Sequence, residues 1–211
     1  MSRFEKIAKE IRNLCDQQGF DLSEAIMDLI AKDLLAAENP KNIKMITNVD
    51  QGEVFKWCEK EYIKLDNLKD GCLCLAKDIL FQSEFDDENK NNWAKSSLRQ
   101  KLGVVIGDYT IKNELVPFDR DLTTDDGQTD YGSCTDSVSL LTCDEYRKYR
   151  KFIPKTDEWH WTITADSLES PNFVRFVCSD GSLDNYDTYF GNGGVRPLIC
   201  LDFWASVEVE E

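Results

Sequence analysis

The residues best suited to recognising a ligand lie between Asn172 and Gly193. Thirteen positions in this segment carry aromatic, amide, acidic, guanidinium, thiol or very small side chains, a composition close to that of antibody paratopes. Rigid rings supply contact area and short polar groups supply adaptable hydrogen bonds, so the chemistry expected here is binding rather than catalysis. The thirteen candidate ligand-binding residues are Asn172, Phe173, Arg175, Phe176, Cys178, Asp184, Asn185, Tyr186, Asp187, Tyr189, Phe190, Asn192 and Gly193.

The candidate positions are interleaved with residues that suit a fixed frame. The frame consists of apolar residues at short spacing, turn glycines and a closing Gly-Val-Arg-Pro: Val174, Val177, Gly181, Leu183 and residues 194–197. We expect Arg196 to tie the loop to neighbouring carbonyls or to a carboxylate, and Pro197 to stiffen the chain before the last strand. A rigid frame beneath varied side chains lowers the ordering cost of binding.

The sequence contains few residues suited to catalysis or to metal binding. His160 is the only histidine, so a nucleophile–histidine dyad or a multi-histidine metal site is nearly excluded, and we expect a strand histidine with one hydrogen bond. The acidic segment 119–130 lacks the spacing of a calcium loop and has no closing Glu, which predicts a solvated loop. Cys72 and Cys74 point the same way in a strand, and without a second pair zinc is not expected. The sequence predicts no enzyme, metal or cofactor.

Short strands must position the binding residues. Strands are expected at Val54–Trp57, Tyr62–Leu65, Cys72–Ala76, Ser139–Thr142, Trp159–Thr164 and Leu198–Trp204. Helical pattern appears from Trp93 to Leu102 and from Cys143 to Tyr149, and residues 119–137 are expected to form a long loop. The fold class predicted is α+β, a domain of many short strands.

The N-terminal segment has a different pattern. Residues 1–40 contain two apolar helical stripes, separated near Gly19 and ended by Asn39-Pro40, which predicts a short helical hairpin appendage. Residues 45–203 would form the binding domain and residues 204–211 an acidic tail. The hairpin either lies on the domain or, through residues 1–38, joins copies into a homo-oligomer.

Composition limits the partners. The 211 residues include 25 basic and 40 acidic side chains, a net charge of −15 that repels nucleic acid and anionic membranes. The first residues do not resemble a signal peptide, and eight cysteines in such a chain are expected to stay reduced. These features predict a cytoplasmic protein, or a virion-associated one if a phage encodes it.

Five motifs occur in an order that resembles a known family. They are Asn-Asn-Trp-Ala-x-Ser-Ser-Leu-Arg (91–99), Ser-Leu-Leu-Thr-x-x-Glu-Tyr (139–146), Trp-Thr-x-Thr (161–164), Val-x-Ser-Asp-Gly-Ser-Leu (177–183) and Gly-Val-Arg-Pro (194–197). Residues 45–203 thereby resemble a bacterial and phage family with a C-type-lectin-like fold, related to the formylglycine-generating enzymes (sulfatase-modifying factors). Many members have Trp-Leu-Arg-Ser where this chain has residues 161–164.

The resemblance implies a particular origin for the candidate surface. Members of the family include variable proteins of diversity-generating retroelements, in which AAC codons mutate to other codons ending in C. Such codons cannot encode Lys, Glu, Gln, Met or Trp, and none of the thirteen positions holds one of these residues. The resemblance implies a protein or glycan ligand at this surface.

Three hypotheses remain open. The first is a non-enzymatic ligand-binding protein with a diversified surface. The second is a fixed structural or assembly component of a phage particle or a bacterial defence complex. The third is a cysteine-dependent oxidase of the formylglycine-generating type, whose copper-binding cysteine pair cannot be placed with Cys178 and Cys200, so that activity is not carried over.

Overall fold

The computed structural model describes residues 42–107 and 114–209, and the predicted helices within residues 1–40 lie outside this part. The chain divides into residues 1–43 with 210–211 and a second unit, residues 44–209, to which nearly all described residues belong. The described part is mainly β-structure, with three sheets and two α-helices. None of its helices is long and apolar enough to span a membrane.

The largest sheet has seven strands in the order β1-β14-β2-β3-β4-β13-β8. Their bounds are β1 Asn42–Met45, β2 Val54–Trp57, β3 Lys60–Asn67, β4 Cys72–Ala76, β8 Val138–Ser139, β13 Leu198–Leu201 and β14 Ser206–Val209. All five residues of β4 are buried, because the strand lies mid-sheet and has side chains packed on both faces. The predicted strands at β2, β4 and within β3 are confirmed.

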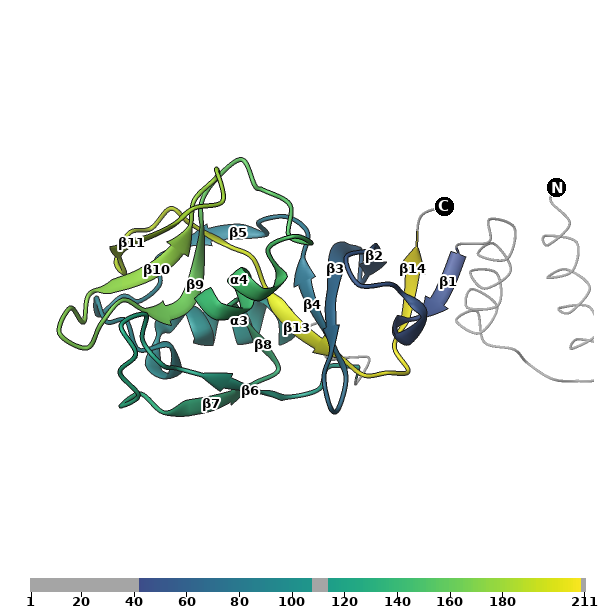
Figure 1. Ribbon diagram of the computed structural model, residues 1–211, viewed down its shortest axis with the longest axis horizontal. Coiled ribbons are helices and arrows are strands. Elements are labelled where there is room, and N and C mark those ends of the chain that lie inside the picture. Colours follow the sequence, from purple (N-terminus) through teal and green to yellow (C-terminus); the bar gives the residue numbers. More distant parts are fainter. Residues whose placement is uncertain (1–41, 108–113, 210–211) are drawn as a thin grey trace, which may run out of the picture. The chain divides into compact units, whose positions relative to one another are not determined.

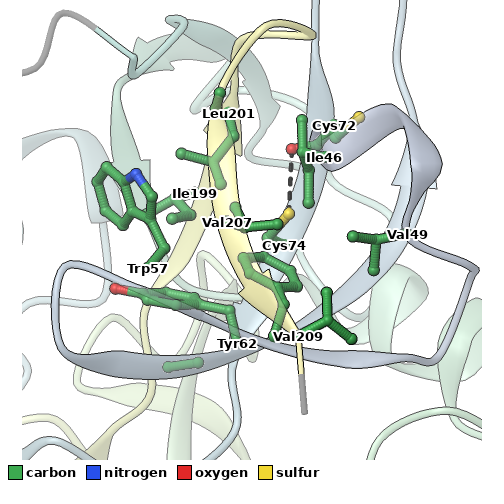
Figure 2. Close-up of a cluster of buried hydrophobic side chains, with 13 residues drawn as sticks. Ile46, Val49, Trp57, Tyr62, Cys72, Cys74, Ile199, Leu201, Val207 and Val209 are labelled. Carbon is green, nitrogen blue, oxygen red and sulfur yellow. Dashed lines mark hydrogen bonds between the residues drawn. The ribbon is translucent and has the colours of Figure 1, made fainter. Parts of the chain in front are cut away.

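Each face of this sheet carries its own hydrophobic cluster. Cys72 and Cys74 point to one face, as expected for residues two apart, and pack there with Trp57, Tyr62 and Ile199 (Figure 2). The intervening leucines of β4 point to the other face and join a second cluster under the helix Cys143–Tyr149. Because side chains alternate along β4, its cysteines join the first cluster and its leucines join the second.

The C-terminal prediction was wrong for residues 206–209. They form β14 rather than a frayed tail, with Val207 and Val209 buried and Glu208 opposite Lys56 of β2. The acidic composition hid a two-residue apolar alternation, which is sufficient for a half-buried strand.

The second sheet has five strands in the order β11-β10-β9-β12-β5. The strands are β5 Phe81–Ser83, β9 His160–Ala165, β10 Phe173–Val177, β11 Leu183–Asp187 and β12 Gly193–Val195. Figure 1 shows β9, β10 and β11 side by side, with β11 at the end of the sheet. All six residues of β9 are buried, which confirms the strand predicted there.

The third sheet corrects the loop predicted at 119–137. Strands β6 (Phe118–Asp121) and β7 (Ser133–Asp136) pair as an antiparallel hairpin. Phe118 and Arg120 point inward, and the Arg120 guanidinium makes two hydrogen bonds of 2.6 Å to the Glu145 carboxylate. An arginine in the place of an apolar residue masked the strand pattern.

Helices complete the described part: η1 (Ile46–Asn48), η2 (Trp93–Lys95), α3 (Ser97–Gly107) and α4 (Cys143–Tyr149). Thr142 caps α4, because its hydroxyl accepts from Glu145 N–H at 3.0 Å while Glu145 Oε2 accepts from Thr142 N–H at 2.8 Å. The strand predicted at Ser139–Thr142 therefore ends at Ser139, since the following residues lead into this cap.

Candidate functional site

Most of the candidate residues lie on one hairpin, formed by β10 and β11. Its register runs from Phe173 opposite Asp187 to the turn at 178–182. Gly181 in this turn has φ of 84°, a left-handed conformation that glycine favours. The hydroxyl of Tyr146 donates to the Gly181 carbonyl at 2.9 Å, so α4 holds the turn in place.

The hairpin sends the candidate side chains to two different faces. On a strand, side chains two residues apart share a face, and directly opposite partners share it too. The first face carries the candidates Phe176, Asp184 and Tyr186. The second face carries the candidates Phe173, Arg175, Asn185 and Asp187.

The first face continues into a surface that we call the aromatic patch, formed by Trp159, Phe176, Tyr186, Tyr189 and Phe190. The ring centroids of Trp159 and Phe176 are 4.8 Å apart, those of Tyr186 and Phe190 are 4.5 Å apart, and those of Tyr189 and Phe190 are 6.4 Å apart. Tyr186, Tyr189 and Phe190 are 38%, 65% and 39% exposed. The patch therefore presents three rings to solvent while their neighbours fix their positions.

The aromatic patch is anchored in the hydrophobic core. The ring of Trp159 lies 4.6 Å from that of Trp161, which lies 6.0 Å from Phe85, and Phe85 lies 5.7 Å from Trp93. Trp161 is fully buried, and its indole N–H donates to the Ser83 carbonyl at 2.9 Å. Aromatic pairs in such tilted and edge-to-face geometries add about 0.5–1.5 kcal/mol each beyond area burial. The exposed rings are thus the outer end of a continuous series of ring contacts that begins in the core.

The second face braces the hairpin against neighbouring loops. Arg175 Nη1 lies 3.2 Å from Asp166 Oδ1, and its Nε lies 3.5 Å from Asp125 Oδ2. Asn185 Nδ2 donates to the same Asp166 oxygen at 2.9 Å. Arg147 also pairs with Asp125, at 3.0 Å. Arg175 Nη1 and Asn185 Nδ2 already have Asp166 as hydrogen-bond partner, although Arg175 Nε has no hydrogen bond among the described residues. These two side chains therefore act more on the position of the hairpin than on a ligand.

Hydrogen bonds also fix the loop that follows β11. The Asp187 carboxylate accepts from Asn172 Nδ2 at 3.3 Å and from the Tyr189 N–H at 3.2 Å. Thr188 is fully buried, and its hydroxyl donates to Asn89 Oδ1 at 2.8 Å. The loop that carries the last two rings of the patch is therefore held on both sides.

The remaining candidate positions differ in exposure. Asp184 and Asn192 are exposed and Cys178 is half-buried. Gly193 does not fit the prediction, because it is buried in β12 and a Cβ there would lie 1.9 Å from Nε1 of Trp161. The Trp161 ring occupies the space that a side chain would need, so Gly193 belongs to the frame.

The predicted frame residues are buried except Leu183, which is half-buried on β11. Val174 and Val177 point into the core from β10. Arg196 is buried and donates to the carbonyls of Ala76 at 2.8 Å and Lys77 at 2.6 Å, which selects backbone carbonyls over a carboxylate as its partners. Burial lowers the pKa of Arg196 to about 10, still far above neutral pH.

Three residues of the site were missed from the sequence. Trp159 joins the aromatic patch, and the Asp166 carboxylate accepts hydrogen bonds from Arg175 and Asn185. Asn91 fixes the segment before β10. The Asn91 side-chain amide donates to the carbonyls of Ser167 and Phe173, both at 2.9 Å. Position within the Asn-Asn-Trp motif was the only sequence signal for Asn91, and the roles of the other two depend on contacts distant in the chain.

Burial opposes an acid–base role for His160 at neutral pH. Its side chain is buried in β9, and burial lowers its pKa to about 3. General acid–base catalysis needs a pKa near the working pH, so a neutral buried imidazole does not serve it. The expected hydrogen bond is absent at Nδ1, which has no partner among the described residues.

Arg147 partly neutralises the acidic segment near α4. A cavity of about 120 Å³ is lined there by Asp121, Asp125, Asp144 and Arg147. Arg147 pairs with Asp144 at 2.8 Å as well as with Asp125. Within residues 42–107 and 114–209, no group of three or more His, Cys, Asp or Glu side chains is arranged to hold a metal ion.

The cysteines of the described part are free thiols. Burial raises the pKa of Cys200 to about 12 and that of Cys74 well above the ordinary range. Because the thiolate is the reactive and metal-binding form, these environments oppose the copper-dependent oxidase chemistry weighed for Cys200.

Comparison with known proteins adds no assignment. No protein-family model matches the chain, and no curated protein or solved structure matches it either.

Proposed function

We propose that this protein is a non-enzymatic ligand-binding protein that recognises another protein through the aromatic patch. The single observation that carries the proposal is the continuous series of edge-to-face ring contacts from the buried Trp161 to the exposed Tyr189. Binding hot spots are enriched in aromatic residues, and rigid rings lose little conformational freedom on association. A protein ligand suits this surface because its anchors are rings rather than a deep pocket.

We further propose that the domain is C-type-lectin-like and that the surface belongs to a variable protein of a diversity-generating retroelement. The order of the five motifs supports this proposal, together with residue types at the candidate positions that codons ending in C allow. The buried frame and exposed rings suit such a role. In such a protein, position 193 would stay glycine, because Trp161 leaves no space for a side chain there.

A display experiment tests the binding proposal. Ligands are selected from a phage-displayed random-peptide library on the full chain, and their affinities are then measured on two variants. Tyr186→Ala with Tyr189→Ala should weaken the selected ligands by about thirtyfold, since loss of aromatic anchors costs about 2 kcal/mol. Trp204→Ala is the matched control, because Trp204 is 77% exposed and lies on the turn between β13 and β14. Equal losses in both variants, or none in the tyrosine pair, would refute the patch as the site.

The surrounding DNA tests the diversification proposal separately. A reverse-transcriptase gene beside a near-copy of the segment encoding residues 172–197, with adenines at the variable codons, would support it. Codons at these positions that do not end in C would indicate a fixed surface, while leaving the binding role intact.

A second candidate function is a fixed subunit of a phage or bacterial assembly. It is favoured by exposed apolar side chains on other elements, Val104 on α3 and Trp204 after β13, which are 78% and 77% exposed. Light scattering of the full chain and of a Val104→Ser, Trp204→Ser variant tests it, because an assembly contact through these residues would be lost with a fall in molecular mass.

A further inference from the structure

The outer edge of strand β11 pairs with no other strand of the described residues. It neighbours only β10 in the five-stranded sheet (Figure 1). Backbone hydrogen bonds from Cys178 to Ser182 and from Thr188 to Asn172 bracket the hairpin, and pairs between them alternate between hydrogen-bonded and non-hydrogen-bonded. The residues that direct both backbone groups away from β10 are Leu183, Asn185 and Asp187.

Most of these outward groups lack a partner. Asp184 Oδ1 accepts from the Asn185 N–H at 2.9 Å, and the Asp187 carbonyl accepts from the Phe190 N–H at 3.2 Å. The other four groups have no hydrogen bond to the described residues: the N–H and C=O of Leu183, the C=O of Asn185 and the N–H of Asp187. An edge with free donors and acceptors is a template for another extended chain.

The charge of this edge selects its occupant. Asp184 is exposed on β11, Asp187 ends the strand, and Asp180 is exposed in the adjoining turn. Pairing with β11 of a second copy would bring these carboxylates together, and like charges on neighbouring strands destabilise a sheet. The net charge of −15 also disfavours self-association.

We propose that β11 binds an extended basic segment of a protein ligand, which adds to the five-stranded sheet as a new edge strand. This inference rests on the proposed binding function and specifies the ligand. Backbone hydrogen bonds to Leu183 and Asp187 supply affinity, and a basic side chain of the ligand pairs with the exposed Asp184. A side chain opposite Tyr186 contacts the rim of the aromatic patch, so strand addition and ring contact are continuous.

Three synthetic peptides test strand addition on the full chain. One alternates valine and lysine, one has the same side chains but N-methylated backbone amides, and one alternates valine and glutamate. The valine–lysine peptide should bind, and N-methylation should weaken it by about tenfold or more because the two backbone hydrogen bonds to the Leu183 and Asn185 carbonyls are lost. In hydrogen exchange followed by NMR, the amides of Leu183 and Asp187 should become slower to exchange on binding.

Asp184→Lys supplies the matched protein variant. Asp184 is exposed, and its one hydrogen bond is to the next residue, so the variant should fold and should prefer the valine–glutamate peptide. No binding of the valine–lysine peptide, equal binding of its N-methylated form, or unchanged exchange at Leu183 and Asp187 would overturn strand addition.

The outcomes separate this inference from the proposed function. If peptides selected from the display library depend on Tyr186 and Tyr189 but tolerate N-methylation, the aromatic patch stands and strand addition fails. If binding depends on the backbone amides and on Asp184 but survives loss of both tyrosines, the edge stands and the patch fails.

Discussion

Replacement of Gly193 by alanine should destabilise the protein strongly, although it adds a single methyl group. The new Cβ would lie 1.9 Å from Nε1 and 2.1 Å from Cε2 of Trp161. Ordinary contact begins at 3.4 Å, so the indole would have to retreat by about 1.5 Å. Such a movement breaks the 2.9 Å hydrogen bond from Trp161 to the Ser83 carbonyl.

The expected loss follows from two contributions. Overpacking a core costs about 1–3 kcal/mol, and leaving a buried donor unpaired costs about 1–3 kcal/mol. We therefore expect the free energy of unfolding to fall by about 3 kcal/mol or more for Gly193→Ala. With a urea m value of about 2 kcal/mol/M, the midpoint would fall by about 1.5 M.

Urea unfolding followed by tryptophan fluorescence measures this loss. Gly191→Ala is the matched control, because the nearest atom to its added Cβ is Glu84 Oε2 at 3.9 Å, and its stability should change by less than about 0.5 kcal/mol. If Gly193→Ala unfolds within that same margin of the wild type, Trp161 does not fill the space as described, and Gly193 returns to the set of candidate ligand-binding positions.

Three further perturbations test the scaffold. Asn91→Ala should lower the free energy of unfolding by about 2–4 kcal/mol in urea titrations, because it removes the three hydrogen bonds that the buried Asn91 amide donates to the carbonyls of Ser167, Ser170 and Phe173, whereas Asn192→Ala at an exposed position should be neutral. The folded-state pKa of His160, about 3, lies below its ordinary 6.5, so the unfolded chain gains a proton first and stability falls as pH drops from 6.5 toward 3. Unfolding titrations of His160→Gln should show a shallower slope there, by at most about 1.4 kcal/mol per pH unit; an unchanged slope contradicts the neutral buried state. Arg120→Met should cost about 3 kcal/mol or more in thermal or urea unfolding, because Glu145 loses its bidentate partner; a neutral result would mean that solvent compensates the carboxylate.

Local patterns in the sequence predicted those elements whose residues alternate cleanly or carry a cap. β4 is an uninterrupted apolar run, and the helical pattern from Cys143 to Tyr149 located α4, whose Thr142 cap only the structure shows. β6 was missed because Arg120 takes an inward-facing position, where it pairs with Glu145. β14 was missed because the acidic composition of the C-terminal residues hid the alternation of Val207 and Val209. Charged residue types alone do not indicate which residues pair across the fold.

The segment that carries the candidate site could be predicted from the sequence, but the separate role of each of its side chains could not. Composition located the segment with Tyr186 and Tyr189, since exposed aromatic and short polar residues between apolar ones are visible in the chain. It did not separate Arg175, which braces the hairpin, from Phe176, which faces the aromatic patch. That distinction depends on Asp166 and other partners remote in sequence, so only the three-dimensional arrangement supplies it.

The turn at 178–182 has a consequence for how this surface can change. Its length sets which residues of β11 oppose those of β10, and the hydrogen bond from Tyr146 holds it at that length. Exchange of one side chain alters the surface locally, whereas insertion of one residue in the turn would invert β11 and carry Tyr186 to the braced side. Substitution can therefore explore many specificities here, while a change in length would erase the surface in a single step.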